Sequence, residues 1–379
     1  MRTTLTEATR TMTADDTLLR TPLYALHQEL GAKFVPFAGY AMPVQFKAGV
    51  LAEHLHCRAE AGLFDVSHMG QLRLTGADPA AALEILVPGE IQALKPGRTR
   101  YTLLTNDSGG IIDDLMVTNR GDHLFLVVNA ATKETDIAHL RLGLAGRAKV
   151  ETLERRALLA LQGPAAASVM WRLAPDLATM PFMSAREAVL DGIGCLLTRS
   201  GYTGEDGWEI SVEGADAERL ARRLLAEKEV APIGLGARDS LRLEAGLCLY
   251  GHDIDETTTP IEAGLDWAIG KRRRAEGGFP GADVIQEQLE KGPLRRRVGL
   301  LPDGKAPARE QTEILAGGRR TGLITSGGFG PSVGGPIAMG YVAAGHDAPG
   351  TAVELLVRGT PRPARIVDMP FTPHRYYRG

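Results

Sequence analysis

The chain changes its pattern at about residue 277, and this change sets the strongest limit on how it folds. Beyond that point, short apolar runs recur at regular spacing and are separated by Gly and Pro, at residues 298–301, 313–315, 321–324, 337–342, 352–357 and 364–367. Short strands of even spacing with turn residues between them are typical of a small antiparallel barrel or sandwich. We therefore expect a C-terminal antiparallel β-barrel domain over residues 282–379.

The first 275 residues carry a mixed pattern instead. Strand-like alternation at 71–75, 101–104, 111–117 and 123–128 occurs beside helix-like periodicity at 23–30, 50–61, 216–228 and 236–249. Strands and helices mixed in this way indicate an α+β fold. Residues 1–20 are rich in Thr and polar groups, and we expect them to be a disordered extension before an α+β region over residues 21–275.

Composition excludes several classes of protein. A net charge of −3 gives no reason to expect binding to nucleic acid or to a membrane surface. No run approaches the roughly 18 apolar residues of a membrane-spanning helix. The three cysteines, Cys57, Cys195 and Cys248, are odd in number and widely spaced, which argues against a disulfide framework and a cysteine metal cluster. We expect a protein of a reducing compartment, the cytoplasm, with no metal centre.

Two neighbouring acids, Asp113 and Asp114, interrupt an apolar strand-like run at residues 111–117. Alternation along a strand sends them to opposite faces, and a buried carboxylate needs a partner or a proton. The ordinary explanation is that one acid caps a loop and the other is solvated at a strand end. The functional explanation is a partly desolvated carboxylate that handles protons or stabilises positive charge. The local sequence does not decide which of the two acids has this role.

A second candidate is the loop at residues 199–209, which holds three glycines, an aromatic pair and several acids between two expected strands. Such a loop lets the backbone approach a flat ligand closely. Glu209 is the first polar residue on the exit strand, where its carboxylate can accept two N–H bonds from an amidine-like edge such as a pterin or a guanine. An ordinary hairpin with a solvated Glu209 is the alternative.

Arg238 lies in the first turn of the helix expected after Gly234. The helix dipole disfavours a cation there unless an anion is nearby, so Arg238 hints at an acidic ligand or at an ion pair within the protein. Other features carry less weight. His54, His56 and Cys57 lack the spacing of metal ligands, and the basic runs at 271–274 and 295–297 are typical of solvated faces.

Several motifs occur in one order along the chain. They are Asp65-Val66-Ser67-His68-Met69-Gly70, Gly109-Gly110-Ile111-Ile112-Asp113-Asp114-Leu115, Val127-Val128-Asn129-Ala130-Ala131, Leu161-Gln162-Gly163-Pro164, Gly201-Tyr202-Thr203-Gly204-Glu205-Asp206-Gly207, Gly234-Leu235-Gly236-Ala237-Arg238-Asp239, Leu249-Tyr250-Gly251-His252-Asp253 and Thr325-Ser326-Gly327. Each motif is weak alone, but the ordered set resembles the T protein (aminomethyltransferase) family of the glycine cleavage system, from residue 21 to nearly the C-terminus.

This resemblance implies a fold and an activity. Family members have three domains in a cloverleaf around a central folate channel, the first two interleaved and the last a β-barrel. They transfer the methylene of an aminomethyl group, carried on the lipoyl arm of the H protein, to tetrahydrofolate and release ammonia. The chain departs from the family at Tyr40, where a Trp is common, and in the segment 327–334.

The resemblance also implies roles for single residues. The critical carboxylate of the family falls on Asp114, beside the reacting nitrogens of the folate. The other positions expected at the folate site are Tyr101, Met116 and Tyr202 as lining residues, Asn129 as a wall residue, Glu209 as the acid at the pterin edge, Arg238 as the substrate-contacting arginine and Tyr376 as a contact near the C-terminus.

Two other functions stay open at this point. The same scaffold can serve a folate-dependent demethylase of a small methyl donor, such as a methoxyaromatic or a sulfonium compound. A non-catalytic folate-binding protein of iron–sulfur assembly is the third possibility, but relatives of that kind carry a Lys-Gly-Cys-Tyr segment where this chain has Gly277-Gly278-Phe279-Pro280-Gly281-Ala282.

Overall fold

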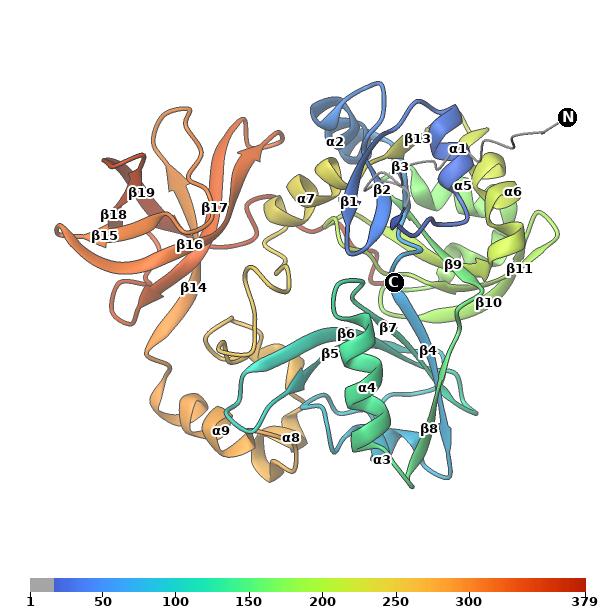
Figure 1. Ribbon diagram of the computed structural model, residues 1–379, viewed down its shortest axis with the longest axis horizontal. Helices are drawn as coiled ribbons and strands as arrows, with labels where there is room; N and C mark the ends of the chain where they lie inside the picture. The colour runs from blue at the N-terminus through green and yellow to red at the C-terminus, as the bar shows by residue number, and fades with distance from the viewer. Residues whose placement is uncertain (1–16) are drawn as a thin grey trace, which may run out of the picture.

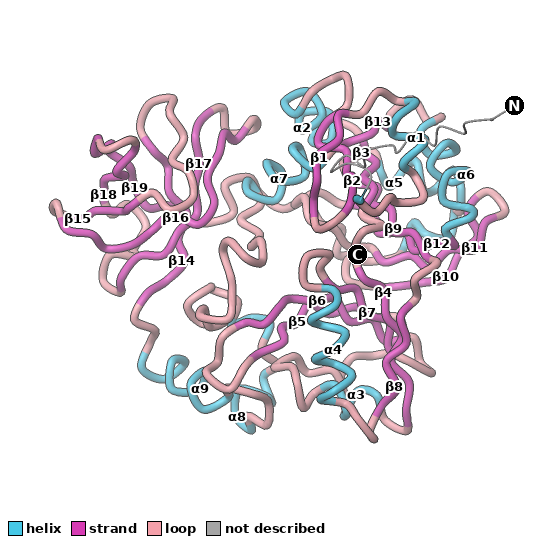
Figure 2. Tube along the Cα trace, in the orientation of Figure 1, coloured by secondary structure: helices cyan, strands magenta, loops and turns pink. Residues whose placement is uncertain are grey.

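The protein is described by a computed structural model that covers residues 17–379 and forms three lobes around a common centre (Figure 1). The expected extension, residues 1–20, lies for the most part outside the described residues. Leu19, near its end, forms a β-bridge with Tyr40. Figure 2 shows that loops and turns occupy much of the centre between the lobes, whereas most helices lie toward the outside.

The first lobe is built on a six-stranded sheet with the order β10-β11-β12-β9-β3-β13, in which only β13 pairs in parallel, with β3. Its strands are β3 (Ala61–Asp65), β9 (Arg156–Gln162), β10 (Ala185–Leu190), β11 (Ile193–Thr198), β12 (Gly207–Glu213) and β13 (Val230–Ile233). A separate hairpin joins β1 (Lys33–Phe37) and β2 (Tyr40–Gln45). The helices of this lobe are α1 (Tyr24–Glu29), α2 (Val50–Ala59), α5 (Ala166–Leu173), α6 (Gly214–Leu225) and α7 (Leu235–Glu244).

The second lobe is an antiparallel five-stranded sheet with the order β5-β6-β7-β4-β8. Its elements are β4 (Gly70–Gly76), β5 (Thr99–Thr105), β6 (Ile111–Asn119), β7 (Leu124–Val128), β8 (Ala148–Thr152), α3 (Pro79–Leu83) and α4 (Lys133–Gly143). A turn joins β5 to β6, and in it the Asn106 side chain accepts hydrogen bonds from the backbone N–H groups of Ser108 and Gly110. The chain therefore leaves the first lobe after β3 and returns to it at β9.

The third lobe is a closed antiparallel barrel with the order β14-β17-β16-β15-β18-β19, which confirms the expected C-terminal barrel and, with the other two lobes, the α+β fold. Its strands are β14 (Arg295–Pro302), β15 (Glu313–Ala316), β16 (Arg319–Gly330), β17 (Gly335–Ala343), β18 (Ala352–Val357) and β19 (Thr360–Val367). Alternate residues point inward, so that Leu300, Ile324 and Leu355 are fully buried in one apolar cluster.

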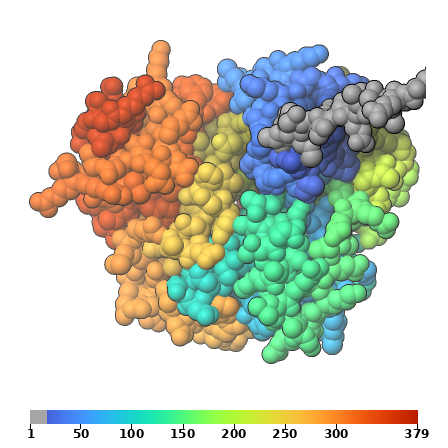
Figure 3. Space-filling view, viewed as in Figure 1, coloured from blue at the N-terminus to red at the C-terminus, as the bar shows by residue number. Residues whose placement is uncertain are grey.

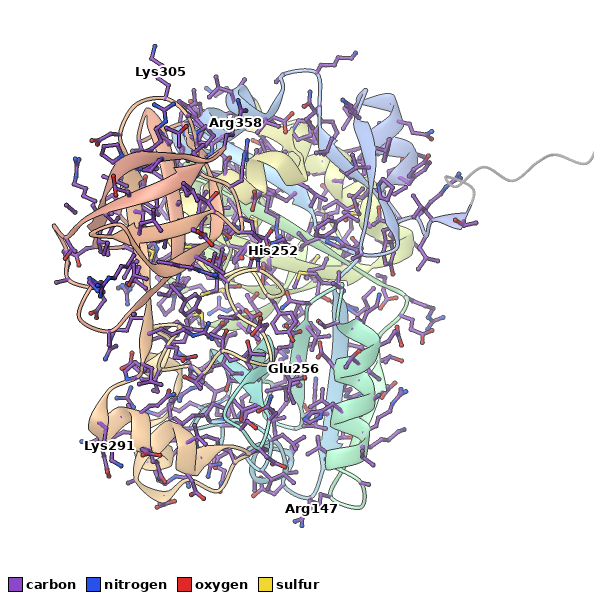
Figure 4. The ribbon with its side chains drawn as sticks, turned by 60° about the vertical axis from the view of Figure 1, so that its left-hand side comes forward. Arg147, His252, Glu256, Lys291, Lys305 and Arg358 are labelled. Carbon is purple, nitrogen blue, oxygen red and sulfur yellow. The ribbon has the colours of Figure 1, made fainter. Side chains whose placement is uncertain are left out.

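The segment between α7 and the barrel connects all three lobes. It includes the short helices α8 (Lys271–Glu276) and α9 (Ala282–Lys291), and in Figure 3 it fills the seam between the barrel and the second lobe. In Figure 4, His252 and Glu256 of this segment lie near the centre of the molecule, whereas Lys291, Lys305 and Arg358 project at its edges. No helix within residues 17–379 is long and apolar enough to cross a membrane.

Two expectations about helices need correction. The helix expected at 236–249 ends at Glu244, because Gly246 adopts a positive φ of 67° that stops the helical turn. The helix α4 was not expected at all. Its apolar face is narrow, with Ile137 and Leu140 buried beside a buried acid, Asp136, so its periodicity is weak.

Candidate functional site

Strand β6 presents its two acids on opposite faces, as the alternation predicts. The side chain of Asp113 is fully buried within the second lobe. Asp114 is only half-buried and shares its face with Met116, which packs against a cluster of apolar residues between the first two lobes. The structure thus separates a closed carboxyl at Asp113 from a more accessible one at Asp114.

Asp114 is held by two neighbours. The side-chain amide of Asn129, just after β7, donates a hydrogen bond of 2.8 Å to Oδ1 of Asp114, and the Tyr101 hydroxyl of β5 also hydrogen-bonds to this carboxyl. Burial, and then the charge of Asp113, raise the pKa of Asp114 to about 7 against these two stabilising bonds. A carboxyl with such a pKa can accept or release a proton at neutral pH.

Tyr101 connects Asp114 to an aromatic surface that the sequence analysis missed. Its ring stacks on Trp267, with the centroids 5.3 Å apart and the planes at 28°, and Trp267 is 61% exposed. Trp267 lies in the segment between α7 and the barrel, where no local pattern marks it. An exposed indole beside a half-buried carboxyl offers a flat surface to an aromatic ligand.

Glu209, Tyr202 and Arg238 form the other half of the candidate site. Glu209 of β12 accepts a 3.1 Å hydrogen bond at Oε2 from the Ser200 hydroxyl, and burial raises its pKa. The Arg238 guanidinium, at the start of α7, lies 4.6 Å from the centroid of the Tyr202 ring. Arg238 also acts electrostatically on Glu209, so these residues come together across three elements.

The two halves meet at the tyrosines. Tyr202, whose hydroxyl donates to the carbonyl of Cys248, interacts electrostatically with both Asp114 and Tyr101. The structure therefore brings together most of the residues expected at the site: Tyr101, Asp114, Met116, Asn129, Tyr202, Glu209 and Arg238. Their contact with a folate stays a prediction.

Tyr376 has different surroundings. Its ring stacks on Phe182 at 4.0 Å, with His374 beside it at 4.9 Å. It lines a surface pocket of about 550 Å³ together with residues such as Trp171 and Arg375, and none of the other expected site residues lines this pocket. Its expected contact with a ligand stays a prediction, and the structure does not place it with the others.

Buried polar residues outside the quoted motifs fix the lobes around the site. Glu244, at the end of α7, accepts hydrogen bonds from Arg58 at 3.1 Å and from the backbone N–H of Ser332 in the barrel at 2.7 Å, and it lies 3.0 Å from Nε2 of His54. Burial opposes ionisation here, but these partners outweigh it and lower the pKa of Glu244 to about 2. His54 thus belongs to a buried ion-pair cluster.

A second cluster joins residues of the Leu249–Asp253 and Thr325–Gly327 motifs. Asp253 accepts hydrogen bonds from Arg242 at 2.7 Å, from Ser326 at 2.8 Å and from Thr325 at 2.5 Å. Because Arg242 is on α7 and the two hydroxyls are on β16, this cluster joins the first lobe to the barrel. Within residues 17–379, no group of His, Cys, Asp and Glu side chains has the arrangement of a metal site.

Comparisons with known proteins agree with this architecture. The GCVT N-terminal domain family matches residues 23–273, and the glycine cleavage T-protein C-terminal barrel domain family matches residues 295–372. A mitochondrial aminomethyltransferase of Dictyostelium discoideum is 48% identical over 97% of this chain and 96% of its own length. One of Gallus gallus is 50% identical over 96% and 95%.

The solved structures include a close match. The glycine cleavage system aminomethyltransferase T of Bartonella henselae is 45% identical and superposes with a TM-score of 0.91, over 95% of this chain and all of that one. One expectation is contradicted by the comparisons. The similar proteins from Dictyostelium discoideum, Solanum tuberosum and Gallus gallus are named mitochondrial, so the expected cytoplasmic location is wrong. A low count of cysteines indicates a reducing environment but does not identify the compartment.

Proposed function

Because the chain belongs to the glycine cleavage T-protein family, we propose that it is the aminomethyltransferase that moves a one-carbon unit from the lipoyl arm of the H protein to tetrahydrofolate. Matches over nearly the whole chain and over both family domains support this activity. The alternatives, a small-molecule demethylase and an iron–sulfur assembly protein, are not favoured by these relatives.

The reaction balances without an oxidant. The methylene carbon loses its bonds to the lipoyl sulfur and to the amine nitrogen, and forms two bonds to nitrogens N5 and N10 of tetrahydrofolate. The two protons displaced from these nitrogens go to the sulfur and to the departing ammonia. The products are 5,10-methylenetetrahydrofolate, ammonia and the dihydrolipoyl carrier. Positive charge therefore develops on the carbon, and protons must be moved away from the folate nitrogens.

The carboxyl of Asp114 carries the proposal, because it suits both requirements. It is half-buried, held at Oδ1 by Asn129, and has a pKa near 7. As a carboxylate it stabilises the positive charge, and the poorly hydrated position strengthens this effect. A group that titrates near neutrality can also accept a proton from a folate nitrogen and pass it on.

Glu209 fits the pterin edge. Its Oε2 accepts one hydrogen bond from Ser200, and within residues 17–379 its Oε1 accepts none. This oxygen is available to the N–H groups of a pterin, which form a donor edge that matches a carboxylate. Arg238, which lies over the Tyr202 ring and near Glu209, supplies a cation for an acidic part of the folate. Trp267 and Tyr101 offer flat surfaces for its rings.

The test is a transfer assay with defined donors. Dihydrolipoyl H protein loaded with formaldehyde and ammonia is mixed with tetrahydrofolate and the enzyme, and 5,10-methylenetetrahydrofolate and free ammonia are measured. We expect both products with loaded, lipoylated H protein. H protein without lipoate is the control and should give neither. Consumption of a sulfonium or methoxyaromatic donor, with no reaction of the loaded carrier, would contradict this proposal and indicate a demethylase instead.

A further inference from the structure

A third acid, Asp136, lies behind the two acids of β6, and the chemistry above gives it no role. It is in the first turn of α4, which packs beside β6 and β7 of the second lobe (Figure 1). Its side chain is fully buried, and neither Oδ1 nor Oδ2 accepts a hydrogen bond. The backbone N–H groups at the start of α4 therefore do not stabilise it. A charged carboxylate in such a position costs several kcal/mol, so Asp136 needs a proton.

The proton on Asp136 has a nearby hydrogen-bond acceptor in the carboxyl of Asp113. After burial, Asp113 is the group that acts most strongly on Asp136, so the two carboxyls lie close together, and two buried carboxylates so placed repel each other unless one of them holds a proton. Asp113 is the better anion of the pair because it already accepts bonds from the Thr132 hydroxyl at 2.7 Å and from the Asn129 amide at 2.9 Å. Burial and the interaction with Asp113 raise the pKa of Asp136 to about 10. Asp136 is thus neutral at physiological pH and has a proton to donate.

The pair is linked directly to Asp114. The single amide nitrogen of Asn129 donates to Oδ1 of Asp113 at 2.9 Å and to Oδ1 of Asp114 at 2.8 Å. The charge of Asp113 is also the second largest cause of the raised pKa of Asp114. A change in the charge of Asp113 therefore reaches Asp114 through a shared donor and through space.

Groups from the other elements do not neutralise the acids. The titratable side chains that face them are the phenols of Tyr101 on β5, Tyr202 in the loop before β12 and Tyr250 after α7, and the thiol of Cys248. Burial raises the pKa of each of these groups, so all of them are neutral near pH 7. The proton on Asp136 is then what limits the negative charge of the cluster.

We propose that Asp136 is a positioning residue whose neutral carboxyl donates a permanent hydrogen bond to Asp113, so that Asp113 stays charged, orients Asn129 and sets the proton affinity of Asp114. This proposal rests on the function proposed above for Asp114. It adds a requirement that the proposed activity alone does not state: the site needs one carboxyl that stays protonated in order that another can titrate.

Two variants of similar size test this role. Asp136→Asn replaces the neutral acid by another neutral donor, and Asp136→Leu fills the space without a donor. We expect Asp136→Asn to keep turnover within about threefold and to leave the acid limb of the kcat/KM profile near pH 7. In Asp136→Leu this donor is lost, so the Asn129 amide that binds both Asp113 and Asp114 is no longer held in place, and the acid limb moves by about one pH unit or more. Loss of activity in Asp136→Asn equal to that in Asp136→Leu would overturn the proposal.

A spectroscopic measurement decides the protonation state without relying on activity or on Asp136→Leu folding. At about pH 8.5, between the two raised pKa values, Asp114 is ionised and Asp136 is not. The infrared difference spectrum of the wild type minus Asp136→Asn should therefore contain the C=O stretch of a neutral carboxyl. Absence of this band would refute a protonated Asp136. If the band is present but Asp114→Asn turns over normally, the role proposed for Asp114 fails while the pair remains.

Discussion

Replacement of Asp114 by Asn should separate the catalytic charge from the fold. The Asn side chain has nearly the same shape, and its carbonyl oxygen can still accept the hydrogen bond that Asn129 gives to Oδ1 of Asp114. What disappears is the negative charge and the ability to take a proton. Removal of one preorganised charge from a transition state costs about 100-fold to 1,000-fold in turnover, and we expect a loss in this range, measured with loaded H protein and tetrahydrofolate.

The same variant should be more stable than the wild type at alkaline pH. The pKa of Asp114 rises from its ordinary 3.8 to about 7 on folding, so the native state holds a proton that the unfolded state has already lost. Stability therefore falls as pH rises between these two values. Three pKa units at 1.36 kcal/mol each correspond to about 4 kcal/mol above about pH 7, and Asn avoids this cost because it never ionises.

Urea denaturation over a range of pH measures this effect. The advantage of Asp114→Asn should be largest at about pH 8, about half as large at about pH 5.5, and nearly absent below about pH 4, where both states of the wild type carry the proton. Asp107→Asn is the matched control, because it changes an exposed acid in the turn that leads into β6. A variant at position 114 with normal turnover, or with lower stability than the wild type at about pH 8, would refute the reasoning.

Two further predictions concern the pterin edge and the lobe contacts. Glu209→Gln should weaken tetrahydrofolate binding about tenfold or more, the cost of a charge-assisted hydrogen bond, in a fluorescence titration; Glu213→Gln on the same strand is the control, and equal losses in the two variants would remove Glu209 from the site. Glu244→Gln should lower the free energy of unfolding by about 3 kcal/mol or more at neutral pH, because it leaves buried partners without their charge. The surface variant Glu218→Gln should cost less than about 1 kcal/mol, and a similarly small effect at Glu244 would show that its cluster does not hold the barrel in place.

The barrel and the two faces of β6 could be predicted because both depend on patterns that are local in the sequence. Short apolar runs between Gly and Pro are sufficient for strands that pair with their neighbours. Alternation is sufficient to separate Asp113 from Asp114. The sequence alone did not decide between these two acids, because burial depends on the helix that covers one face of the sheet. That helix, α4, has a buried acid where a helix pattern normally has an apolar residue. Its apolar periodicity is therefore too weak to predict the helix.

Contacts between distant segments could not be predicted in the same way. Asp136 lies close to Asp113 within the second lobe, and Trp267 of the connecting segment stacks on Tyr101 of β5, only because the fold brings together residues that are distant in the sequence. No local spacing encodes such pairs. The family resemblance supplied Tyr376 as a site residue, but the side chain stacks on Phe182 outside the contacts that unite the other positions. Its role depends on where a long folate ligand extends.

A crystal structure with bound tetrahydrofolate tests the central claim most directly. We expect the pteridine ring between β6 and the loop of Tyr202, with a carboxyl oxygen of Asp114 within about 3.2 Å of a reacting folate nitrogen, directly or through one water, and Glu209 at the edge that carries the N–H donors. A pteridine bound elsewhere on the molecule, with Asp114 facing bulk solvent, would contradict the account.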